Sequence, residues 1–126
     1  MQTVTQLELK EPIRVNRERL GDLYTQLGEH SAEDVVCRAM EEVSLRMTHC
    51  DRAFRARDWA DLRKSARSLI AIADQIGMQD VGRVAADVVA CIDRQDHVAT
   101  AATLGRLMRA GEGSLSAVWD LQDLTI

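Results

Sequence analysis

The chain of 126 residues contains very little proline and few aromatic side chains. Its one proline, Pro12, lies near the N-terminus, so no proline interrupts a helix in the rest of the chain. Aromatic residues make up 3% of the sequence and alternating apolar and polar runs are absent, which argues against a β-rich fold. No run of about 18 apolar residues occurs, so we expect no membrane-spanning segment.

Cysteines and excess positive charge are also scarce. The three cysteines, Cys37, Cys50 and Cys91, have no CxxC spacing, so we expect neither a disulfide framework nor a zinc site. The polar N-terminal residues lack the apolar region of a secretory signal, which favours a cytoplasmic location. Sixteen basic and 20 acidic residues give a net charge of −4. Because nucleic acids and anionic membranes attract positively charged proteins, we expect neither as a partner.

Apolar residues recur at the three- and four-residue steps that are typical of amphipathic helices. A first helix is expected from about Asn16 to Leu27, and a second from Ser31 onward. Asp58 and Asp96 are candidate N-caps of two further helices, and another helix lies between them. The expected apolar seams are Leu20, Leu23, Tyr24 and Leu27; Val36, Met40, Val43, Met47, Cys50 and Phe54; Leu62, Ala66, Leu69, Ala73 and Ile76; Val81, Val84, Ala85, Val88, Cys91 and Ile92; and Ala101, Leu104, Met108, Leu115 and Val118.

These helices predict an all-α fold, because short connections between long amphipathic helices force antiparallel neighbours. The expected architecture is an antiparallel up-and-down four-helix bundle with a short N-terminal helix that caps one end. Residues 1–14 are expected to form a flexible tail, and residues 15–126 one bundle domain. Gly111 and Gly113 interrupt the last seam, so we expect the last helix to bend or stop there.

Residues that could perform catalysis are few. The histidines, His30, His49 and His97, form no metal-binding spacing with cysteines or carboxylates, and no glycine-rich phosphate loop is present. The apolar seams also lack the inward polar residues that an enzyme in the bundle core would need. We therefore expect no catalytic residue, no metal and no cofactor.

One segment, Ala66 to Gly77, reads ARSLIAIADQIG. It resembles the third-helix signature of histidine-containing phosphotransfer (HPt) domains, AHxLKGxAxxxG. Ala66, Leu69, Ala73 and Gly77 fall on the alanine, leucine, alanine and glycine positions of the signature. The resemblance extends over about residues 16–123, and it implies a four-helix bundle with a role in two-component signalling.

The chain departs from the signature at the residues that carry the chemistry. The phosphoacceptor histidine corresponds to Arg67, the following lysine to Ile70 and the next glycine to Ala71. A guanidinium is protonated at neutral pH and is not a usable phosphoryl nucleophile. A glutamate common on the family's fourth helix corresponds to Val89. The resemblance thus implies an HPt-like protein without enzymatic phosphotransfer, unless one of the three histidines serves as a relocated acceptor.

The equivalent face of phosphotransfer proteins docks on a receiver domain, whose active pocket is acidic. The resemblance therefore implies a response-regulator receiver domain or a histidine kinase as the partner. Arg67 would form charge-assisted hydrogen bonds with that pocket, and Ile70 and Ala71 would provide an apolar flank. Lys64 and Arg63 would add electrostatic support.

Two other interpretations remain open. The chain could be a structural or dimerising helical bundle without receiver contact, which would form a homodimer through an exposed apolar patch. The residues of that patch would be Ile70, Ile72, Val89 and Leu107. Alternatively, the methionines of the seams could line a small-molecule site, although methionine at such spacing is usually core filler.

Overall fold

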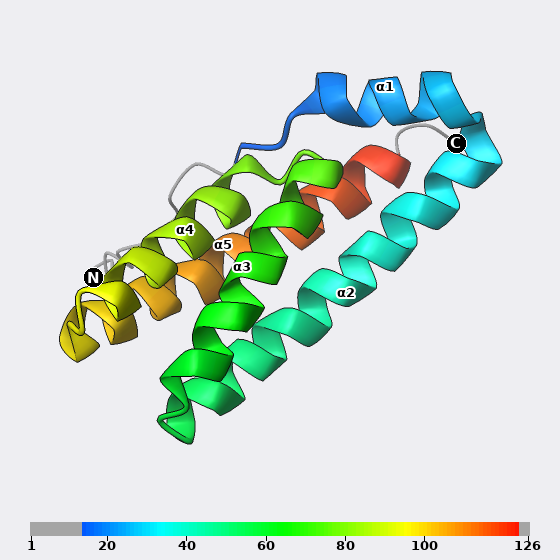
Figure 1. Ribbon diagram of the computed structural model, residues 1–126. Helices are drawn as coiled ribbons and strands as arrows, with labels where there is room; N and C mark the ends of the chain where they lie inside the picture. Colours follow the sequence, from blue (N-terminus) through cyan, green and yellow to red (C-terminus); the bar gives the residue numbers. More distant parts are fainter. Residues whose placement is uncertain (1–13, 124–126) are drawn as a thin grey trace, which may run out of the picture.

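The structure, a computed structural model, describes residues 14–123 and is all-helical over that range, as predicted (Figure 1). Its five helices are α1 (Arg17–Leu27), α2 (Glu29–Arg55), α3 (Trp59–Gln75), α4 (Gln79–Asp93) and α5 (His97–Asp123). The expected start of the second helix at Ser31 is two residues late, because Gly28 alone separates α1 from α2 and serves as the N-cap. Of the expected tail, only Arg14 lies within the described residues.

Helices α2 to α5 pack in a closed cycle. Each contacts the next helix along the chain, and α5 returns to α2. Short turns join them, so that each helix runs back along its predecessor (Figure 1). Helix α1 contacts α2 and lies across the end at which α3 leads into α4 (Figure 1). There the Asn16 N–H donates a hydrogen bond of 2.8 Å to the Gly77 carbonyl.

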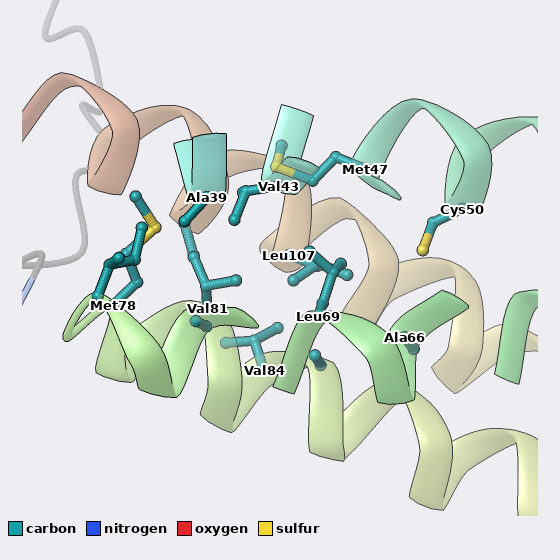
Figure 2. Packing of buried hydrophobic residues seen from close by; sticks show 14 of the residues in the cluster. Ala39, Val43, Met47, Cys50, Ala66, Leu69, Met78, Val81, Val84 and Leu107 are labelled. Atoms are coloured by element: carbon teal, nitrogen blue, oxygen red, sulfur yellow. The ribbon is translucent and has the colours of Figure 1, made fainter. Parts of the chain in front are cut away.

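One apolar core joins all the helices, and most seam residues predicted from the sequence are buried in it. Figure 2 shows Leu69 of α3 and Leu107 of α5 directed into this core. The predicted exposure of Leu107 is wrong, since its side chain is 0% exposed. The predicted seam of α5 is wrong at Ala101, which is exposed. The polar residues Thr100 and Ser114 are buried instead. Because they are polar, the apolar pattern of the sequence did not identify the buried face of α5.

Helix α5 continues through its glycines, so the predicted stop at Gly111 and Gly113 is wrong. Gly111 is buried at the contact with α2. A β-carbon placed there would overlap the Sδ and Cε atoms of Met47, which Figure 2 shows in the core. The glycine therefore lets the two helices approach each other, and the packing offsets its cost of about 1 kcal/mol in helix propensity.

The α2–α3 and α4–α5 turns share one construction. Arg57 and Gln95 adopt the left-handed conformation, with φ of 56° and 57°. The next residues, Asp58 and Asp96, each accept a hydrogen bond at Oδ1 from the N–H three residues later, at 3.1 and 3.0 Å. Both predicted N-caps are thereby confirmed.

The residues after these caps connect the two turns. Trp59 and His97 stack, with ring centroids 4.3 Å apart and an interplanar angle of 13°. Phe54 contacts the same tryptophan edge-on at 5.8 Å. This aromatic contact holds the two turns together at the end of the molecule opposite α1.

A buried carboxylate fixes the segment that precedes α1. Asp80, at the start of α4, is 4% exposed in its side chain. Its Oδ2 accepts a hydrogen bond of 2.7 Å from the Arg14 N–H, and its Oδ1 contacts the guanidinium groups of Arg14 and Arg83, both at 3.1 Å. Burial raises the pKa of Asp80, but these hydrogen bonds outweigh burial, so the pKa lies below its ordinary value.

The lowered pKa of Asp80 predicts a contribution to stability that depends on pH. The folded chain binds this proton less readily than the unfolded chain, so the contribution is complete above the ordinary carboxyl pKa of about 4. It is lost as the pH falls through the lower folded pKa. In urea unfolding from pH 7 to pH 3, we expect the free-energy gap between wild type and Asp80→Asn to shrink on acidification. The control is Asp22→Asn, at an exposed position of α1, and it should follow wild type. A constant gap for Asp80→Asn would contradict the assignment.

Candidate functional site

The middle of α3 presents the residues that the HPt resemblance singles out. The helix buries Leu62, Ser65, Ala66, Leu69 and Ala73, so that the intervening positions face outward. Arg67 is exposed. It borders a hollow of about 410 Å³ on the surface of α3, and the residues that line this hollow are Ala60, Arg63, Lys64, Arg67 and Ser68.

Arg63 is held by an ion pair with α4. Its Nε donates to Asp93 Oδ1 at 2.8 Å, and its second guanidinium nitrogen donates to Asp93 Oδ2 at 3.2 Å. These hydrogen bonds raise the pKa of Arg63 and lower the pKa of Asp93, and the nearby positive charge of Arg67 also lowers the latter. Because Asp93 compensates the charge of Arg63, the positive charge offered by the hollow comes mainly from Lys64 and Arg67.

Ile70 and Ala71, the predicted apolar flank of Arg67, lie in different surroundings. Ile70 is half-buried and packs against the core. It lines a different hollow of about 300 Å³, together with residues of α4 and residues at the start of α1 such as Asn16 and Arg19. Ala71 is exposed and lies one helical turn after Arg67, so the two share one face. The structure thus brings Arg63, Lys64 and Arg67 together and turns Ile70 toward its neighbouring helices.

The three histidines lie apart from the hollow at Arg67. His30 is exposed in the first turn of α2, and His97 stacks on Trp59. His49 Nε2 lies 2.7 Å from Asp61 Oδ2, a contact between α2 and α3 that the sequence analysis did not identify. The only indication of this contact in the sequence is that the two residues lie 12 positions apart, on opposite sides of the predicted turn. Within residues 14–123, no group of three His, Cys, Asp or Glu side chains is placed to hold a metal ion.

The cysteines differ in accessibility. Burial raises the pKa of Cys50 to about 11, with a further contribution from the negative charge of Asp61. Such a thiol is a poor nucleophile at neutral pH, since the thiolate is the reactive form. Cys91 is also buried, whereas Cys37 is exposed on α2. Cys37 is therefore the accessible thiol among the described residues.

The self-association patch predicted from the sequence is not present as an exposed set. Leu107 is fully buried, and Ile70, Ile72 and Val89 are half-buried against the core. The large apolar side chains that are exposed in the described part of the chain are instead Leu27, Leu45, Val98 and Trp119. Leu27 was expected in the first apolar seam, and that prediction is wrong, because its side chain is 45% exposed. Leu45, Val98 and Trp119 belong to none of the predicted seams, and single apolar residues outside a seam carry no periodic pattern.

No helix among residues 14–123 combines the length and the apolar character needed to cross a membrane. Comparison of the chain with protein-family models, with curated proteins and with solved structures finds no match. The functional interpretation of Arg67 therefore depends on the motif in α3 and on the geometry around it.

Proposed function

We propose that the chain is an HPt-like signalling protein that binds a partner without accepting a phosphoryl group. Its partner would be the acidic pocket of a response-regulator receiver domain or of a receiver-bearing histidine kinase in the cytoplasm. The observation that carries the proposal is the exposed position of Arg67 on α3, at the place that the phosphoacceptor histidine occupies in the HPt signature.

The arrangement of the helices supports the proposal. A short helix precedes four longer ones that pack in a closed cycle, and the motif lies on the second of those four. This order agrees with an antiparallel up-and-down four-helix bundle capped by α1, which is the architecture that the resemblance implies. Arg67 and Ala71, near the centre of α3, are exposed and therefore accessible to another protein.

The charges around Arg67 suit an acidic partner. Lys64 and Arg67 line the same hollow, and the ion pair between Arg63 and Asp93 anchors its edge. A guanidinium that meets a carboxylate cluster forms charge-assisted hydrogen bonds, which are stronger than neutral ones. Arg67 would therefore dock in the acidic pocket, with Lys64 as electrostatic support and Ala71 as the apolar contact on the same face.

The same geometry disfavours phosphotransfer. Arg67 offers no usable nucleophile, and no histidine lines its hollow. Ile70 replaces the lysine that steadies the phosphoryl group in the family, and its half-buried side chain carries no charge. We therefore assign this face a role in binding rather than in phosphotransfer.

A titration of Arg67→Ala against receiver domains from the same genome tests the proposal. We expect affinity to fall about 10- to 100-fold, because hydrogen bonds to charged groups contribute about 1.5–3 kcal/mol. Arg38→Ala removes an exposed arginine from α2 and serves as the matched control, with affinity unchanged. Equal losses in both variants, or no binding by the wild-type chain, would refute the docking role of Arg67.

A second prediction concerns Arg67→His, which restores the family's acceptor. We expect this variant to remain poorly labelled by a phosphorylated receiver, because Ile70 and Ala71 still replace the lysine and the glycine. The triple variant with Ile70→Lys and Ala71→Gly is the comparison, and it should label faster. Rapid labelling of the single variant would show that the neighbouring residues do not matter.

A further inference from the structure

A second surface feature lies between α2 and α5, away from the hollow at Arg67. It is a groove of about 470 Å³, and none of its lining residues belongs to α3. The residues that line it are Cys37, Met40, Glu41, Ser44, Leu115, Ser116, Trp119 and Asp120. We call this feature the α2–α5 groove.

Both helices contribute apolar side chains to the α2–α5 groove. Met40 and Leu115 are half-buried and pack against the core from opposite helices. Trp119 also lines the groove, with 57% of its surface exposed. A tryptophan with so much exposed surface beside apolar side chains is the kind of residue that anchors protein interfaces.

The charge of the groove is of one sign. Glu41 lies on the α2 wall and Asp120 on the α5 wall, and no lining residue is basic. Both carboxylates are exposed, and none of the ion pairs found among residues 14–123 includes either of them. A complementary partner would therefore carry positive charge on both sides of an apolar stripe.

We propose that the α2–α5 groove binds an amphipathic helix of another protein, with lysine or arginine residues on both flanks of its apolar face. A helix fits because a groove between two helices accepts a third helix through residues at i, i+3, i+4 and i+7. A second copy of this chain in a two-fold contact fits poorly, since it would bring the acidic walls of two grooves together. This proposal does not depend on receiver binding, because the two surfaces share no residue.

A designed peptide tests the proposal with the full-length chain. The probe is a peptide of about 18 residues, with leucines at helical i, i+3, i+4 and i+7 positions and lysines on both flanks. The control peptide has the same leucines and glutamates in place of the lysines. Calorimetry should detect binding of the lysine peptide and at least about tenfold weaker binding of the glutamate peptide, because like charges oppose each other at the walls.

Variants of the chain locate the binding site. Trp119→Ala should weaken the lysine peptide about 30-fold, as loss of an anchoring tryptophan does. Glu41→Gln with Asp120→Asn should weaken it about 3- to 10-fold through loss of two exposed ion pairs. Val98→Ala is the matched control, with affinity unchanged, because it removes another exposed apolar side chain of α5 that does not line the groove. Circular dichroism of each variant verifies that it is folded.

The thiol of Cys37 provides a local readout, because it lines the groove and is exposed while Cys50 and Cys91 are buried. Peptide at ten times its Kd should slow alkylation of Cys37 about tenfold by mass action. Absence of binding by the lysine peptide, equal affinity for both peptides, unchanged affinity in Trp119→Ala or unprotected Cys37 would each overturn the proposal. A concentration-dependent dimer that Trp119→Ala abolishes would also overturn it, by identifying a second copy as the occupant.

Discussion

Gly77→Ala is expected to lower the free energy of unfolding by about 2–4 kcal/mol. Gly77 has a φ of +74°, which residues with a β-carbon rarely adopt. A β-carbon there would also lie 2.7 Å from the Asn16 carbonyl oxygen, which is backbone and cannot rotate away. The substitution would therefore push α1 off the α3–α4 turn. Urea unfolding followed by circular dichroism measures the loss.

Alanine substitutions at two other glycines distinguish the two causes of this loss, which are backbone strain and the steric overlap with Asn16. Gly28 has a φ of +79° but open space around its α-carbon, so Gly28→Ala should cost only the backbone strain, about 1–3 kcal/mol. Gly21 lies in α1 with neither a positive φ nor a close neighbour. Gly21→Ala should stabilise by about 0.5–1 kcal/mol through helix propensity. If Gly77→Ala were as mild as Gly21→Ala, the contact between α1 and the α3–α4 turn would not be as described.

Gly111→Ala is expected to destabilise the chain by about 1–3 kcal/mol, although alanine is the better helix former. The added methyl group would overlap the end of the Met47 side chain, which is 5% exposed and must find another rotamer within the packed core. Urea unfolding of the variant measures the change. In the same helix, a β-carbon at Gly105 would make an ordinary contact of 3.6 Å with Arg109, so Gly105→Ala should stabilise.

A double-mutant cycle tests whether Met47 causes the effect of Gly111→Ala. Met47→Ala alone leaves a cavity and destabilises. Combined with Gly111→Ala, it removes the overlap, so the loss should be smaller than the sum of the single losses by about 0.5–3 kcal/mol. Additive losses would mean that the two residues do not restrict each other.

The sequence predicted helices α1 to α4 and most of their buried faces because their inward positions hold large apolar residues. In α3, for example, Leu62 and Leu69 mark the buried face and are fully buried, as is Ile76 at the C-cap of the helix. The caps at Asp58 and Asp96 were predictable for a similar reason, since a capping carboxylate acts on its own helix and needs no tertiary contact.

Helix α5 shows where sequence reasoning failed. Its buried face includes Gly111, which has no side chain, and Thr100 and Ser114, whose side chains are polar, so none of the three is recognised as a core residue from an apolar pattern. Their inward placement follows from close packing against neighbouring helices, and such packing depends on tertiary structure. Because Ala101 was expected to be buried and Leu107 to be exposed, the predicted buried face of α5 differs from the observed one.

The candidate site was predictable only in part. Arg67 and Lys64 could be placed on one exposed face from helical spacing and from the HPt signature. The pairing of Arg63 with Asp93 depends on the register between α3 and α4, which spacing within one helix does not reveal. The α2–α5 groove was missed for the same reason, because its walls are 71 or more residues apart in the chain, as from Ser44 to Leu115.

The most direct test of the receiver-binding face is a nuclear magnetic resonance titration of the ¹⁵N-labelled chain with receiver domains from its genome. If Arg67 docks in the acidic pocket, the shifted amides should cluster around the hollow on α3, at Ala60, Lys64, Arg67 and Ser68, and Arg67→Ala should abolish the shifts. Shifts confined to the α2–α5 groove, or no shifts with any receiver, would contradict receiver binding through Arg67.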